Sequence, residues 1–202
     1  LLFILPYNGF AQVSGGEISY QHLGSDTILV KVCFYKDCNA SSAVTDSIKV
    51  TPSCSTAFSI HANWATYRDV TPVCRKSCTR CSDHSCNFGF GIQEYIGYAE
   101  FSLKGYGCSD YTFSCEGCCW PNPRDPINPT WLYLEAKMNV SKAGYHSSPA
   151  FINPPSVRGC TNACGANDQS VGGEVSDSFD YQLAEIYISP TDKFNYPTGK
   201  TY

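Results

Sequence analysis

Residues 17–35 read Glu-Ile-Ser-Tyr-Gln-His-Leu, then Gly-Ser-Asp, then Thr-Ile-Leu-Val-Lys-Val-Cys-Phe-Tyr. The outer segments, 17–23 and 27–35, are rich in β-branched and aromatic residues, which favour strands. The middle segment, 24–26, contains glycine and aspartate, which are typical of turns. Two such runs joined by a short connection that contains glycine predict an antiparallel β-hairpin.

The rest of the chain repeats this pattern. Turn-forming Gly, Pro, Asn and Ser residues separate the later apolar runs, and this alternation indicates an all-β sandwich. No window keeps an apolar period of 3.6 residues for three turns, so we expect no long helix. The further strands are expected at 46–51, 56–63, 92–103, 111–114, 132–139 and 179–188.

The composition excludes several classes of protein. The 202 residues include 13 cysteines, 14% aromatic and only 16% charged residues, with a formal net charge of −4. Intrinsic disorder is excluded, because enough apolar surface exists to offset the chain entropy lost on folding. The acidic balance argues against a nucleic-acid partner, which requires a basic face. No stretch approaches the roughly 18 apolar residues of a membrane span, so no transmembrane segment is expected.

Residues 1–11 are expected to be part of a signal peptide. Residues 1–6 are apolar, and Gly9 and Ala11 occupy the −3 and −1 positions of a plausible cleavage site before Gln12. A buried N-terminal strand is the alternative. The signal peptide predicts a secreted chain that works at the cell surface or outside the cell.

In that oxidising setting the cysteines are expected to form disulfides, each of which stabilises the fold by about 2–4 kcal/mol. The connectivity cannot be derived from one sequence. The odd number leaves at least one cysteine free, bonded to another chain, or bonded to a partner beyond Tyr202. The candidates are Cys33, Cys38, Cys54, Cys74, Cys78, Cys81, Cys86, Cys108, Cys115, Cys118, Cys119, Cys160 and Cys164.

Zinc binding is the alternative role for two pairs of cysteines. Cys78 and Cys81 form one C-x2-C pair, and Cys115 and Cys118 form another. The gap between the two pairs exceeds the roughly 15–20 residues that are usual in a zinc ribbon. Disulfides are therefore the preferred interpretation.

Nothing in the sequence predicts catalysis. Ser147 follows His146 but lacks the G-x-S-x-G elbow of a nucleophile. Glu94, Glu100 and Glu135 lie on predicted strands, yet no pattern marks two of them as a glycosidase pair. We expect that the chain is not an enzyme.

The aromatic residues offer a second possible function. Trp120 and Trp131 are candidates for a platform that binds sugar rings, although most large aromatic side chains of a β-sandwich fill its core. The irregular loops 74–91 and 120–129 are expected to present any recognition surface. A secreted carbohydrate-binding module is therefore the alternative function.

Several landmarks resemble the amino-terminal region of large secreted surface proteins of the Bacteroidota. Residues 15–20, Gly-Gly-Glu-Ile-Ser-Tyr, are similar to a strand of the GGEITY type, and residues 35–38, Tyr-Lys-Asp-Cys, to the YRDC end of the next strand. Residues 108–119 resemble a C-x-D-W-x-F-S pattern that is followed by a Cys-Cys pair. Residues 148–155 are similar to an N-S-P-x-F-x-N-x-P segment, which opens an immunoglobulin-like or cadherin-like unit in that family.

The resemblance implies a module of a multi-domain chain. Such proteins are exported by type IX secretion, often end in a gliding-motility-associated or sorting domain, and serve as surface or adhesin-like proteins. We therefore expect a disulfide-rich β-sandwich at 12–144 and an incomplete second β unit at 145–202. The implied partners are other modules of the same chain and extracellular polysaccharide or cell-surface proteins.

The resemblance also raises a calcium site in the second unit. The family carries a D-x-D-G-D-S-L-x-Y-x-L stretch there, but residues 173–183 keep few of its acidic positions. Calcium takes about six to eight oxygen ligands. We expect no cofactor, and calcium at Glu174, Asp177 and Asp180 stays open as the alternative.

Overall fold

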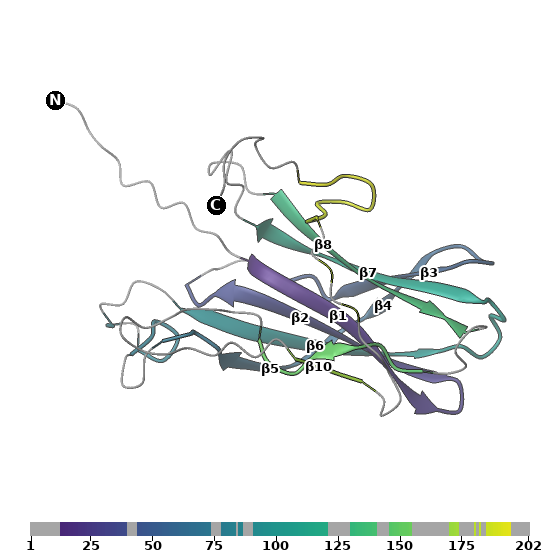
Figure 1. Ribbon diagram of the computed structural model, residues 1–202, viewed down its shortest axis with the longest axis horizontal. Coiled ribbons are helices and arrows are strands. Elements are labelled where there is room, and N and C mark those ends of the chain that lie inside the picture. The colour runs from purple at the N-terminus through teal and green to yellow at the C-terminus, as the bar shows by residue number, and fades with distance from the viewer. Residues whose placement is uncertain are drawn as a thin grey trace.

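The computed structural model describes residues 13–39, 44–73, 78–83, 85–86, 91–120, 130–140, 146–154, 170–173, 180, 182 and 185–194. Within them the chain is all-β, as predicted, and most strands belong to two four-stranded antiparallel sheets stacked as a sandwich (Figure 1). The first sheet has the order β1 (Val13–Gly24), β2 (Thr27–Asp37), β6 (Ile92–Ser102), β5 (Asn63–Asp69). The second sheet has the order β4 (Phe58–His61), β3 (Ser47–Pro52), β7 (Asp110–Trp120), β8 (Thr130–Asn139).

The core lies between the two sheets and follows from the alternation of the strands. On β2, Ile28, Val30, Val32 and Phe34 are completely buried, because every second side chain of a strand points to the same face. The second sheet contributes Ile48 and Val50 from β3 and Tyr111, Phe113 and Cys115 from β7 to the same cluster.

The predicted first hairpin is confirmed. β1 pairs antiparallel with β2 along nearly its whole length. The connection is shorter than expected, since Gly24 still belongs to β1 and only Ser25 and Asp26 form the turn. Both turn residues have a positive φ, 46° for Ser25 and 63° for Asp26. Two successive residues in this left-handed conformation give a turn whose twist matches that of the strands in a two-residue hairpin.

Three predicted strands differ from the observed ones. The run 56–63 divides at Ala62, because β4 ends in the second sheet and β5 begins in the first. β7 extends from the predicted 111–114 to Trp120. The strand expected at 179–188 is wrong at the described residues 185–188. Residues 185–194 form a turn that holds only an isolated bridge between Tyr187 and Lys193.

Among the described residues, three disulfides fasten the loops of the sandwich. Cys38 bonds to Cys81, and Cys54 bonds to Cys108, with Cα separations of 5.2 and 5.4 Å. The first bond lies beside Gly91, just before β6, and Cys108 of the second bond follows the end of β6, so the two bonds brace opposite ends of that strand. The third bond closes a short loop between Cys78 and Cys86.

Two disulfide candidates prove to be free thiols. Cys33 and Cys115 are buried and unbonded, which corrects the expectation for these two residues. Cys33 lies on the first sheet and Cys115 faces the core from the second, so the strands that carry them hold them apart. The side chains of the five remaining candidates lie outside the described residues: Cys74, Cys118, Cys119, Cys160 and Cys164.

Two described segments beyond residue 145, around Ser148 and Tyr187, bond to strands of the sandwich. β9 (Ala150–Phe151) and β10 (Val171–Gly172) form a small antiparallel pair. The backbone N–H of Ser148 donates to the carbonyl of Tyr20 on β1. The backbone N–H of Tyr133 on β8 donates to the carbonyl of Tyr187. The division into units at 12–144 and 145–202 stays a prediction. In the part of the chain that the structure describes, no helix has the length and apolar character needed to cross a bilayer.

Candidate functional site

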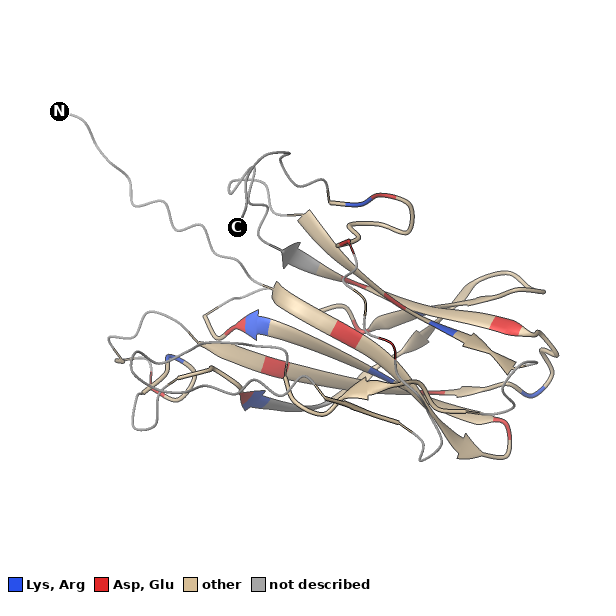
Figure 2. Cartoon of the chain, in the orientation of Figure 1, with Lys and Arg blue, Asp and Glu red and all other residues tan. Residues whose placement is uncertain are grey.

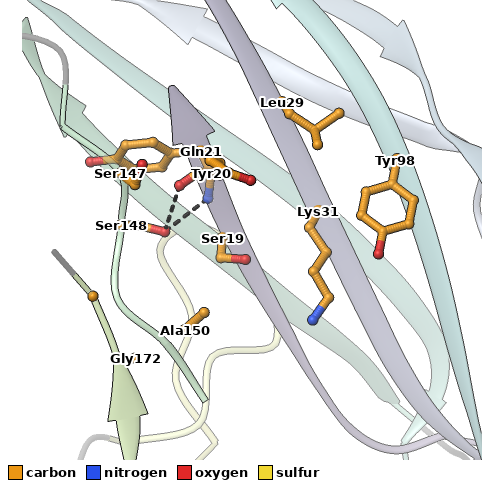
Figure 3. A pocket seen from close by; sticks show the side chains of 11 residues that line it. Ser19, Tyr20, Gln21, Leu29, Lys31, Tyr98, Ser147, Ser148, Ala150 and Gly172 are labelled. Atoms are coloured by element: carbon orange, nitrogen blue, oxygen red, sulfur yellow. Dashed lines mark hydrogen bonds between the residues drawn. The ribbon is translucent and has the colours of Figure 1, made fainter. Parts of the chain in front are cut away.

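The face of the first sheet that points away from the core carries a hollow of about 400 Å³ (Figure 3). We call it the sheet-face hollow. Its floor comes from β1, β2 and β6, and its wall from the segments around Ser148 and Gly172. Its volume falls within the range of about 300–1,000 Å³ that is typical of small-molecule sites. It is lined by Ser19, Tyr20, Gln21, Leu29, Lys31, Tyr98, Ser147, Ser148, Ala150, Gly172 and Gly173.

The register of three strands aligns the polar floor of the hollow. Ser19 on β1 pairs with Lys31 on β2, and Lys31 pairs with Tyr98 on β6. Neighbouring strands are about 4.8 Å apart, so the three side chains form a row across the sheet. Figure 3 shows the Lys31 ammonium and the Tyr98 hydroxyl extending toward the same side. Leu29 lies in the next row and adds an apolar contact.

The wall of the hollow is bonded to the floor. The Ser148 hydroxyl accepts a hydrogen bond from the Tyr20 N–H at 2.8 Å and donates one to the Tyr20 carbonyl at 3.2 Å (Figure 3). The Ser147 hydroxyl accepts from the His22 N–H at 3.2 Å. These bonds satisfy the exposed edge of β1, which otherwise offers unpaired backbone groups to other chains.

Lys31, which lines the hollow, forms a charged pair with Glu17, which lies beside it. Lys31 Nζ lies 3.5 Å from Glu17 Oε1, a long separation for a hydrogen bond. Burial raises the pKa of Glu17, and the neighbouring Lys31 opposes this effect only in part. The described charges of both signs are few and spread over both sheets, so none gathers into a large patch (Figure 2).

A buried polar cluster lies beside the hollow on the same face. Glu94 is 3% exposed; its Oε2 accepts a hydrogen bond from Arg68 Nε, and its Oε1 lies 3.6 Å from the Cys33 sulfur. Burial raises the pKa of Cys33 to about 12 and also raises the pKa of Tyr35. A buried thiol with a raised pKa is a poor nucleophile at neutral pH, so Cys33 is not suited to act as one in the folded chain.

The aromatic candidates divide between surface and core. Trp131 is 50% exposed on β8, while the side chain of Trp120 lies outside the described residues. Trp64 packs against Phe34 in the core, at 6.3 Å between ring centroids, and Tyr111 is 2% exposed. The expectation that most large aromatic side chains fill the core holds for Trp64 and Tyr111, and Trp131 is the exposed tryptophan of the described chain.

The structure bears on the zinc hypothesis more directly than on the calcium hypothesis. Zinc at the first C-x2-C pair is excluded, because Cys78 and Cys81 are both in disulfides. Glu174 and Asp177 lie outside the described residues, and Asp180 accepts a hydrogen bond from Gln182 at 2.7 Å. Among the described residues no group of three or more potential ligands is suitably placed for a metal ion.

The loops that were expected to present a recognition surface are only partly described. Residues 78–83 form turns held by hydrogen bonds between Thr79 and Ser82, and Thr79 also donates to Asp69. Residues 121–129 lie outside the described chain.

The hollow is not predicted from the sequence, because Ser19, Lys31 and Tyr98 belong to no motif that marks a site. Strands 17–23, 27–35 and 92–103 were predicted, so placing the first pair of strands in register would have aligned Ser19 with Lys31. Nothing local in the sequence indicates that β6 pairs with β2.

No protein-family model, curated protein or solved structure matches the chain. The resemblance to Bacteroidota surface proteins therefore stays a prediction.

Proposed function

We propose that this chain is a secreted, non-catalytic module of a larger cell-surface protein, with a structural or adhesive role. The observation that supports this proposal is the pair of disulfides, Cys38–Cys81 and Cys54–Cys108, that braces opposite ends of β6. Disulfides form and persist outside the reducing cytoplasm. A chain built around them is suited to an extracellular setting.

The disulfide between Cys54 and Cys108 fastens a loop to the core, because Cys108 is buried in the core cluster. Cys54 lies between β3 and β4, and Cys108 lies between β6 and β7, so one bond joins a loop of the second sheet to a connection between the sheets. Tyr106 stacks on Phe58 beside this bond, at 5.4 Å between ring centroids. Loops fixed in this way keep a constant shape, which lowers the entropic cost of binding a partner.

The proposed partners are other modules of the same chain and extracellular polysaccharide or cell-surface proteins. The resemblance to type IX-secreted surface proteins supports this choice, since chains of that kind carry several modules in series.

Protease shaving of intact source cells tests the proposal. We expect added trypsin to remove the chain, as detected with an antibody, while a cytoplasmic marker survives. Deleting its coding region is expected to reduce adhesion of the cells to polysaccharide-coated surfaces. A chain that resists trypsin until the cells are lysed would contradict the surface location.

The second candidate function is carbohydrate binding through exposed aromatic side chains. Trp131 favours it, because its ring is half-exposed and Tyr133 follows on the same face of β8. Retention on immobilised polysaccharides should fall in Trp131→Ala and persist in Lys137→Met, a matched change on the same face. A parallel Trp120→Ala variant tests the other tryptophan, and unchanged retention in both tryptophan variants would reject this candidate.

A further inference from the structure

The sheet-face hollow has the properties of a preformed site. Its floor is a regular row of side chains on paired strands, and its wall is tied to β1 through both the backbone and the hydroxyl of Ser148. Such a site needs little ordering when a ligand arrives, which favours affinity.

The polar groups of the floor offer donors and acceptors side by side. Lys31 carries three N–H donors, and the Glu17 carboxylate at 3.5 Å can take only one of them, so Lys31 retains donors for a ligand. Glu17, with 13% of its side chain exposed, does not line the hollow and pairs with Lys31 from beside it. The Ser19 hydroxyl lies next to Lys31 in the row and can both donate and accept. Two adjacent hydroxyls of a ligand fit this pair, because one accepts from Lys31 while the other bonds to the Ser19 hydroxyl.

The same floor provides an apolar surface. Tyr98 is half-buried and presents its ring and hydroxyl at the end of the row, and Leu29 lies in the neighbouring row. A ligand with apolar C–H groups and polar hydroxyls fits this combination, since aromatic side chains bind through an apolar body and a polar tip.

The charge balance selects a neutral ligand over an anion. Glu17 offsets the charge of Lys31, and Glu100 lies on the same face of β6 two residues beyond Tyr98. The whole chain carries a formal net charge of −4. An anionic ligand therefore meets no net positive field at this site.

We propose that the sheet-face hollow binds one ring of a neutral saccharide, with Lys31 and Ser19 holding two adjacent hydroxyls and Tyr98 contacting the ring. This inference rests on the proposed surface-binding role and gives it a site other than Trp131.

Ligand-observed saturation-transfer NMR on the secreted, disulfide-intact chain tests this proposal. The probes are mannose, galactose, N-acetylglucosamine and cellobiose as neutral sugars, and glucuronate as the anionic one. We expect saturation transfer to at least one neutral sugar. We also expect its dissociation constant to rise tenfold or more in Lys31→Met and in Tyr98→Ala.

Two control variants distinguish a loss at this site from a general effect of removing a lysine or an aromatic side chain. Lys137→Met removes a lysine from the other sheet, and Trp131→Ala removes the exposed tryptophan, so both are expected to bind as the unmodified chain does. Circular dichroism and thermal melting establish that Lys31→Met and Tyr98→Ala are folded.

Three results would overturn the proposal: no saturation of any neutral sugar at millimolar concentration, binding of glucuronate alone, or loss of binding in Trp131→Ala but not in Lys31→Met. None of these bears on protease shaving, so a failure here is distinguishable from a failure of the surface role.

Discussion

The ring of Phe34 on β2 lies directly against the backbone of Gly117 on β7. A Cβ added to Gly117 would lie 2.5 Å from Phe34 Cε1, which is closer than real Cβ atoms approach. The two residues belong to opposite sheets, so this contact sets the spacing of the sandwich at that point. Gly16 of β1 lies against the same ring, with 3.0 Å between its added Cβ and Phe34 Cδ1.

Gly117→Ala is therefore expected to destabilise the fold. The added methyl group forces the Phe34 ring out of its position, and overpacking of this kind costs about 1–3 kcal/mol. Urea unfolding measures the change in the free energy of unfolding. Gly15→Ala is the control, because its added Cβ meets only Tyr35 Cδ2, at 3.8 Å. Equal stability of the two variants would show that the sheets are not held apart by this contact.

Two of the disulfides, Cys54–Cys108 and Cys78–Cys86, close loops of different length and should differ in their effect on stability. Cys54 and Cys108 are 54 residues apart, and Cys78 and Cys86 are 8 apart. On the chain-entropy account, removing the first as a double serine variant lowers the free energy of unfolding by about 4 kcal/mol, and removing the second by about 2.5 kcal/mol. Urea unfolding of both variants checks the order. The reverse order would mean that the bonds act mainly through the folded state.

Glu17 should make the stability depend on pH. Burial raises its pKa above the ordinary value of 4.5, with Lys31 opposing the shift and Glu94 adding to it. The folded chain then holds the proton more tightly than the unfolded chain. The stabilisation from Glu17 is fully present below the unfolded pKa and is lost as the pH rises through the folded pKa.

Glu17→Gln removes this titration. We expect the free energy of unfolding of that variant to change less as the pH rises above 4.5, the ordinary pKa of the group, than that of the unmodified chain. Glu100→Gln, an exposed change on β6, serves as the control and should keep the original slope. A Glu17→Gln curve with the unmodified slope would assign the pH dependence to other groups.

The sequence predicted the strands better than their connections. Alternation over 27–35 and the turn residues before it predict the first hairpin, because both signals are local. The passage from β4 to β5 at Ala62 was missed, since only the partner strands show that the chain changes sheet there. β7 was predicted too short because Gly117 and its neighbouring cysteines lack the β-branched side chains that mark a strand.

The candidate site could not be predicted from the sequence for a similar reason. Lys31 and Tyr98 are neighbours only because β2 pairs with β6, and the strands between them in sequence belong to both sheets. The free state of Cys33 likewise depends on which strand carries it. The exposed Trp131, in contrast, was among the predicted surface candidates.

The state of the cysteines in the source cells tests the central claim most directly. Intact cells are treated with N-ethylmaleimide, and the chain is digested without reduction and analysed by mass spectrometry. We predict linked peptides that carry Cys38–Cys81, Cys54–Cys108 and Cys78–Cys86. The buried thiols Cys33 and Cys115 should take up label only after unfolding. Recovery of the six paired cysteines as labelled thiols would contradict both the bracing of the sandwich and its extracellular role.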